Sequence, residues 1–183
     1  MKYYKTIYIG PTGSGKSYKA INQAINNEGT TILVNGCVDK SYYQKAFPAI
    51  RKFNTLNVLN SRRSININNG NKYYIYNDYL DNDKNYLNIA KSIALNLVED
   101  EENALVLFDD NSWNDFRGEK ETVFEKLTQN ACGISIVVQH PCELFDEWDE
   151  AKVSEKLSSI SKKWNIVYCA CSDWDKDGVG FNR

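Results

Sequence analysis

Eight residues near the start of the chain have the types and spacing needed to bind phosphate. They read GPTGSGKS from Gly10 to Ser17 and match the pattern G-x-x-x-x-G-K-[ST] at every fixed position. The glycines allow successive backbone N–H groups to point inward around an anion, Lys16 adds a positive charge, and the Ser17 hydroxyl is a ligand for Mg²⁺. A helix after the loop would direct the positive end of its dipole at the same anion. The predicted nucleotide-binding residues are Gly10, Pro11, Thr12, Gly13, Ser14, Gly15, Lys16, Ser17 and Tyr18.

A second candidate site lies at the end of an apolar run in the second half of the chain. Residues 104–108 read ALVLF, and Asp109 and Asp110 follow directly. A buried strand of this kind can place a carboxylate beside the Mg²⁺ opposite the phosphate loop. We predict that Asp109 contacts the metal through a water molecule and that Asp110 orients or deprotonates the attacking water. The alternative is an acidic pair that only begins a turn.

Gln139 is a third candidate, because it follows the apolar run ISIVV. In open α/β folds ligands bind at the carboxyl ends of the strands, so an amide there can contact the γ-phosphate or the attacking water. The alternative is a polar residue that begins a turn before His140 and Pro141.

Stretches with strand and helix patterns alternate along the whole chain, which predicts an α/β fold with three layers and a mostly parallel central sheet. The phosphate loop follows the first strand, and the acidic pair follows a buried strand. Pro48 should end or kink the second helix. We expect strands at 6–10, 30–36, 104–108, 134–138 and 166–171, and helices at 17–27, 41–53, 86–98, 119–130 and 151–163.

Residues 54–78 have a different character from the rest of the chain. SININ at 64–68 and KYYIY at 72–76 flank the turn signal Asn69-Gly70-Asn71. We interpret this segment as an antiparallel hairpin inserted into the parallel sheet or added to its edge. No linker or repeat interrupts the pattern, so residues 1–183 are expected to form one domain.

The composition limits the class of protein and its partners. Hydrophobic residues make up 42% of the 183 residues, which is enough for a core, and no apolar run is long enough to span a membrane. Five cysteines without a framework spacing predict reduced thiols and a cytoplasmic location. Between residues 40 and 72 there are seven basic residues, no acidic ones, and aromatic residues among them. This segment predicts either a nucleic-acid surface or core aromatics with a solvated basic face.

The order of these motifs resembles that of the FtsK/HerA branch of P-loop ATPases, in which the fold is RecA-like (ASCE). The phosphate loop, the strand that ends in the acidic pair and the later strand that ends in Gln139 carry this resemblance. The short length and the run GISIVVQHPCEL resemble the genome-packaging ATPases of viruses. The resemblance implies a Mg²⁺-dependent ATP hydrolase that acts as a DNA translocase. It also implies a pentameric or hexameric ring around double-stranded DNA, with the viral capsid as a further partner and a host-cytoplasmic or virion location.

Such rings use an arginine from a neighbouring subunit to stabilise the charge that develops on the γ-phosphate. In similar packaging ATPases this arginine often lies on the helix before the glutamine strand, but residues 127–130 of this chain read LTQN. Arg117 is the nearest substitute, with Arg62 and Arg63 as alternatives. The predicted catalytic residues are therefore Lys16, Asp110, Gln139 and Arg117.

Two other functions fit the phosphate loop. One is a small nucleoside or nucleotide kinase, for which the length of the chain is suitable. The lid of such a kinase would need several arginines, but the only arginines after residue 110 are Arg117 and Arg183. A phage assembly ATPase without motor activity, or a nucleotide-binding switch, is the other alternative. Phosphate release into water, transfer to a nucleoside, and stimulation by DNA distinguish these functions.

Overall fold

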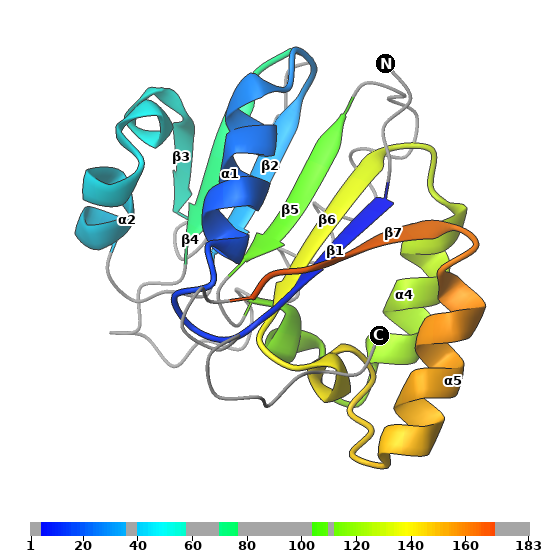
Figure 1. The fold of residues 1–183 in the computed structure, drawn as a ribbon. Helices are drawn as coiled ribbons and strands as arrows, with labels where there is room; N and C mark the ends of the chain where they lie inside the picture. The colour runs from blue at the N-terminus through cyan, green and yellow to red at the C-terminus, as the bar shows by residue number, and fades with distance from the viewer. Residues whose placement is uncertain (1–4, 36–39, 58–69, 77–103, 110–111, 171–183) are drawn as a thin grey trace.

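The computed structural model describes residues 5–35, 40–57, 70–76, 104–109 and 112–170. Within these residues seven strands form one sheet in the order β3-β4-β2-β5-β6-β1-β7, and all six strand pairings are parallel (Figure 1). The strands are β1 Lys5–Ile9, β2 Thr31–Asn35, β3 Asn54–Asn57, β4 Lys72–Tyr76, β5 Leu105–Asp109, β6 Gly133–Val138 and β7 Trp164–Tyr168.

Helices cover both faces of this sheet and give three layers. The α-helices are α1 Lys16–Asn26, α2 Lys40–Ala46, α4 Lys120–Gln129 and α5 Glu150–Ile160. In the same described residues, three short 3₁₀ helices accompany them, namely η1 Pro48–Lys52, η3 Ser112–Phe116 and η4 Pro141–Leu144. In Figure 1, α1 and α2 lie on one side of the sheet and α4 and α5 on the other.

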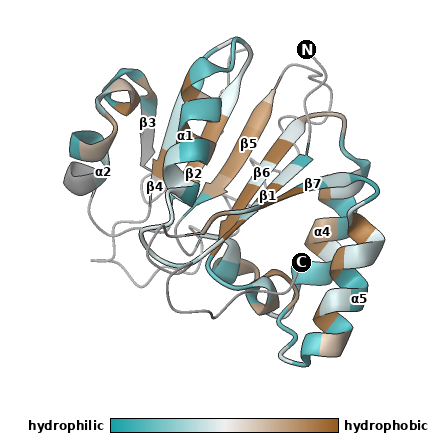
Figure 2. Ribbon diagram, in the orientation of Figure 1, coloured by the Kyte–Doolittle hydropathy of each residue, from teal (hydrophilic) through white to brown (hydrophobic). Residues whose placement is uncertain are grey.

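The two faces of the sheet are separate cores, because successive residues of a strand point to opposite faces. Ile7 and Ile9 of β1 pack with η3, α4, η4 and α5, whereas Tyr8 packs with α1, α2 and η1. In β5, Phe108 belongs to the same core as Ile7 and Ile9, and Leu107 belongs to the same core as Tyr8. Strands buried on both faces read as continuous apolar runs, and Figure 2 shows this hydrophobic colouring along β5 and β6.

The expected α/β fold with a mostly parallel sheet is confirmed, and most elements lie within two residues of their predicted bounds. Pro48 does end the second helix: α2 stops at Ala46 and η1 begins at Pro48. The helix expected at 86–98 lies outside the described residues. β3 was not anticipated as a strand, and it pairs with β4 at one edge of the sheet.

The prediction of an antiparallel hairpin is wrong for its second strand. Gly70 does lie in a turn, with φ 78°, but β4 pairs in parallel with β2 on one side and with β3 on the other. Both edges of β4 are therefore occupied by parallel neighbours. Asn69-Gly70-Asn71 signals a local turn, and a local turn does not fix which strands become neighbours. The first expected arm, residues 64–68, lies outside the described residues.

The strand order brings the ends of the functional strands together at one edge. β6 lies between β1 and β5, so the residues that follow these three strands are neighbours. The chain leaves β1 for α1 on one face, whereas it leaves β6 for η4 and α5 on the other face. A crevice forms where neighbouring strands continue to opposite faces, and this is where ligands of open parallel sheets bind.

Candidate functional site

The loop after β1 has a glycine where no other residue fits. A Cβ atom on Gly10 would lie 2.2 Å from the carbonyl oxygen of Cys169 and 2.7 Å from the Oγ atom of Ser14. The Gly10 N–H donates to the carbonyl of Val138 at 3.3 Å, so the chain is held against the ends of both neighbouring strands. A side chain at this position would displace the backbone of the loop.

Two further glycines of the loop adopt backbone conformations that favour glycine. Gly13 has φ 84° and Gly15 has φ 77°, and the Ser14 N–H donates to the Pro11 carbonyl at 3.2 Å. Left-handed residues turn neighbouring N–H groups toward a common point, which is the geometry that binds an anion. The observed backbone therefore has the features that the glycine spacing predicts.

Helix α1 begins at the loop with its N-terminal end uncapped by side chains. Its N-cap residue, Gly15, is in the left-handed conformation, and no acidic residue lies in the first turn. The positive end of the helix dipole is therefore directed at the loop, and no acidic residue of the helix itself offsets it. Ala20, Ile21 and Ala24 are fully buried against the sheet, and this packing fixes the helix in position.

Lys16 is buried, with 9% of its surface exposed. Its Nζ atom donates to the carbonyl oxygen of Pro11 at 3.1 Å, so the ammonium group lies within the curve of the loop. A phosphate oxygen could replace that carbonyl as the acceptor. Among the described residues that line the adjoining cavity, Lys16 is the only cation.

Ser17 and Asp109 are joined directly across the site. The Ser17 hydroxyl donates to Oδ1 of Asp109 at 2.9 Å, although the two residues are 92 positions apart in the chain. Asp109 is fully buried at the end of β5, beside Asn35 of β2. A hydroxyl and a carboxylate are hard oxygen donors of the kind that Mg²⁺ prefers. The predicted metal residues are thus brought together by the fold.

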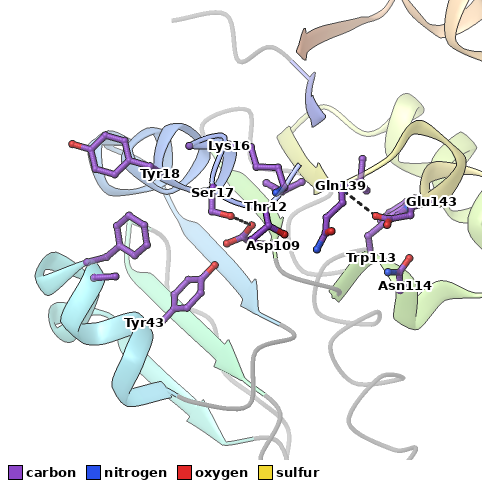
Figure 3. A pocket seen from close by; sticks show the side chains of 16 residues that line it. Thr12, Lys16, Ser17, Tyr18, Tyr43, Asp109, Trp113, Asn114, Gln139 and Glu143 are labelled. Carbon is purple, nitrogen blue, oxygen red and sulfur yellow. Dashed lines mark hydrogen bonds between the residues drawn. The ribbon is translucent and has the colours of Figure 1, made fainter. Parts of the chain in front are cut away.

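Gln139 is exposed at the end of β6, and a carboxylate holds its backbone. The Gln139 N–H donates to Oε2 of Glu143 at 2.9 Å, and both residues line the cavity (Figure 3). The sequence patterns did not single out Glu143. The available signal was an acidic residue four positions after Gln139, with Pro141 beginning a short 3₁₀ helix between them.

Lys120 is a second functional candidate that the sequence did not reveal. Only 3% of its surface is exposed, and its Nζ atom donates to Oδ1 of Asn114 at 2.9 Å and to the carbonyl oxygen of Glu143. It also pairs with Oδ1 of Asp146 at 2.9 Å. Asn114 and Glu143 both line the cavity. Lys120 therefore joins η3 and η4, which form the wall opposite the phosphate loop.

The charge of Lys120 is balanced by Asp146. Burial acts to raise the pKa of Asp146, but the hydrogen bonds from Lys120 and from the Gly118 N–H outweigh it and lower the pKa below its ordinary value of 3.8. A lysine in the first turn of α4 is unfavourable for the helix dipole. The carboxylate offsets this cost.

These groups surround a cavity of about 420 Å³. One wall is the loop that follows β1, another is the end of β5 and β6, a third comes from α2, and η3 and η4 form the fourth (Figure 3). The described residues that line it are Thr12, Gly13, Gly15, Lys16, Ser17, Tyr18, Tyr43, Ala46, Phe47, Asp109, Trp113, Asn114, Val137, Val138, Gln139 and Glu143.

Some predicted site residues lie outside this cavity or outside the described part of the chain. Asp110, Arg62 and Arg63 lie outside the described residues. Arg117 is exposed in the turn between η3 and α4 and does not line the cavity; its backbone N–H donates to the Asn114 carbonyl at 3.2 Å. Its predicted role from a neighbouring subunit stays a prediction.

The basic segment divides into core and surface. Tyr43 and Phe53 are buried in the core under α1 and α2, whereas Lys45, Arg51 and Lys52 are exposed. The Nζ atom of Lys72 lies 5.8 Å from the centroid of the Phe53 ring, but neither buried ring is exposed beside Lys45, Arg51 or Lys52. Of the two interpretations of this segment, the described part agrees with core aromatics beneath a solvated basic face.

Comparisons with models of protein families, with curated protein sequences and with solved structures found no match. In the described part of the chain no helix is long and apolar enough to cross a bilayer. The same residues contain no cluster of three or more histidine, cysteine, aspartate or glutamate side chains that could hold a metal ion.

Proposed function

We propose that this protein is a Mg²⁺-dependent nucleoside triphosphatase whose substrate is ATP. The hydrogen bond of 2.9 Å between Ser17 and Asp109 carries the proposal, because it joins the phosphate loop to the acidic strand at one end of the cavity. A glycine-rich turn can occur without a nearby aspartate, and an aspartate can end a strand without a nearby glycine-rich turn. Because the two motifs are in contact here, a single bound Mg·nucleotide would explain the presence of both.

The residues present fit a bound Mg²⁺. The Ser17 hydroxyl would be a direct ligand, and Asp109 would hold the metal through water, while phosphate oxygens complete its coordination. Bound Mg²⁺ neutralises charge on the β- and γ-phosphates. The backbone N–H groups between Gly13 and Ser17, together with the first turn of α1, would bind the β-phosphate. Lys16 would exchange the Pro11 carbonyl for an oxygen of the β- or γ-phosphate.

Gln139 lies on the opposite side of the cavity from Ser17 (Figure 3). Its proposed role is to orient a water molecule at the γ-phosphate. In the hydrolysis step the water oxygen bonds to the γ-phosphorus, the bond to the bridging oxygen breaks, and ADP leaves. Asp110, which follows β5 directly, is our proposed acceptor for the proton of that water. Glu143 holds the backbone of Gln139, so it acts here as a positioning residue.

We further propose that hydrolysis drives translocation of double-stranded DNA by a ring of subunits, as in viral genome packaging. This finer proposal rests on the family resemblance of the motifs. One observation supports it: among the described residues that line the cavity, Lys16 is the only cation. A second cation from a neighbouring subunit would complete the charge stabilisation of the γ-phosphate.

One experiment tests both levels of the proposal. Phosphate release from Mg·ATP is measured with and without double-stranded DNA while the oligomeric mass is followed by light scattering. DNA-stimulated release together with a larger assembly supports the translocase. Slow release without a response to DNA keeps the triphosphatase and overturns the motor. Transfer of phosphate to an added nucleoside, without release, would identify a kinase instead.

A further inference from the structure

The cavity beside the phosphate loop has a second end lined by aromatic rings. The ring centroid of Tyr18 lies 6.1 Å from that of Phe47, and the Phe47 centroid lies 5.6 Å from that of Tyr43. All three residues line the cavity, together with Ala46. The cavity thus passes from oxygen and nitrogen groups around Ser17 and Asp109 to rings contributed by α1 and α2 (Figure 3).

Tyr18 is not explained by core packing. It is one of the few large hydrophobic residues among the described ones with a high exposure, 63%, and it lies two residues after Lys16. An exposed aromatic face at the rim of a cavity is suited to stacking on a flat ring. Nucleotide bases offer such a ring whatever their identity.

Tyr43 supplies a second, independent observation. The residue is 4% exposed, and its hydroxyl has no hydrogen-bond partner among the residues that the structure describes. In Figure 3 this hydroxyl points toward Ser17 and Asp109, and it lies between the polar end and the ring end of the cavity. A buried hydroxyl without a partner is costly, and a ligand with a hydroxyl group would remove that cost.

We propose that the ring end of the cavity binds the nucleoside of the nucleotide. Tyr18 and Phe47 stack on the base, and the Tyr43 hydroxyl forms a hydrogen bond with a hydroxyl of the sugar. The order of groups in the cavity matches the order of phosphates, sugar and base in a nucleotide. This inference rests on the proposed function, because it requires the phosphates to bind at Lys16 and Ser17.

The test compares Mg·ATP with Mg·tripolyphosphate, which has the phosphates but no nucleoside. Calorimetric titration of the full chain should give tighter binding of ATP than of tripolyphosphate. Tyr18→Ala should weaken ATP binding by roughly 5- to 150-fold, the range for loss of one stacking contact, and leave tripolyphosphate binding unchanged. Trp148→Ala is the matched control, since Trp148 is 76% exposed and does not line the cavity. It should change neither affinity.

The sugar contact has its own comparison. Tyr43→Phe keeps the buried ring and removes only the hydroxyl, so it should weaken ATP binding by roughly 2- to 10-fold. It should not affect 2′,3′-dideoxy-ATP, which lacks the sugar hydroxyls. Equal weakening of both nucleotides by Tyr43→Phe would overturn the assignment to the sugar.

The outcomes separate this inference from the proposed function. If wild-type protein binds ATP no more tightly than tripolyphosphate, and Tyr18→Ala changes neither affinity, the nucleoside site is wrong while the phosphate site stands. If Tyr18→Ala weakens both ligands equally, Tyr18 supports the phosphate loop and does not stack on a base. If well-folded protein binds neither ligand, both the inference and the proposed function fail.

Discussion

The hydroxyl of Ser17 and the carboxylate of Asp109 are in hydrogen-bond contact at 2.9 Å, with Asp109 fully buried. This contact joins the first turn of α1 to the end of β5. The strands that lead to the two residues, β1 and β5, are not themselves paired, since β6 lies between them in the sheet. A change at either residue, or at the groups that hold them in place, should therefore alter nucleotide binding or hydrolysis.

The substitution Asp109→Asn keeps the size of the side chain and removes its charge. Because Asp109 is expected to hold Mg²⁺ through water, the affinity for Mg²⁺ in the presence of nucleotide should fall by roughly 10- to 100-fold. Titration of MgCl₂ into protein with a fluorescent ATP analogue measures this. ATP binding in EDTA should be equal in the two proteins. An unchanged Mg²⁺ requirement would remove Asp109 from the metal site.

The substitution Lys16→Ala should lower the rate of ATP hydrolysis by about 100-fold or more. It removes the only cation among the described residues that line the cavity. Lys16 donates to the Pro11 carbonyl within its own loop, so the fold should persist, as checked by circular dichroism. Lys19→Ala is the matched control, because Lys19 is exposed on the same helix and does not line the cavity. Equal loss of activity in both variants would contradict a specific role for Lys16.

Gly10→Ala and Gly15→Ala should differ in their effect on stability for a steric reason. The Cβ atom that Gly10→Ala adds would meet the Cys169 carbonyl oxygen at 2.2 Å, so this variant should lower the free energy of unfolding by about 3 kcal/mol or more. At Gly15 the space is open and only the positive φ is unfavourable, at about 1–2 kcal/mol. Gly118→Ala has the same open space and positive φ outside the cavity and serves as the control. Urea unfolding measures all three, and equal losses at positions 10 and 118 would contradict the steric argument.

Lys120→Met should destabilise the wall formed by η3 and η4. The variant keeps the aliphatic bulk but removes the charged group that donates to the Asp146 carboxylate and to the Asn114 oxygen. Because Asp146 is partly exposed, we expect a loss of about 1–3 kcal/mol in the free energy of unfolding. Hydrolysis should slow as well, since Asn114 and Glu143 would no longer be joined. Full stability with full activity in Lys120→Met would show that this connection is dispensable.

The same variant should change the dependence of stability on pH. The pKa of Asp146 is lowered in the folded protein, so its contribution is present above its unfolded value near 3.8 and is lost as pH falls through the folded value. Lys120→Met removes the principal cause of this lowering. The difference in stability between wild type and variant should therefore shrink below about pH 4. Urea unfolding at a series of pH values checks this, and a constant difference would contradict the pairing.

Much of the fold follows from local patterns. The glycines and the lysine of the loop, the apolar runs before Asp109 and Gln139, and the proline at position 48 each act through the conformation or burial of their own segment. Such signals predict an element wherever they occur. They do not predict its neighbours, and for this reason β4 was expected in a hairpin although it lies between two parallel strands.

The glycine-rich turn after β1, the buried strand that ends in Asp109 and the α/β class could all be predicted from the sequence, because each depends on residues adjacent in the chain. Three other relationships became visible only in the folded chain: β6 separates β1 from β5, Lys120 joins η3 to η4, and Tyr43 and Phe47 face the same cavity as Lys16. These relationships join residues far apart in the chain. They depend on which strands pair and which faces are covered, and no local pattern contains that information.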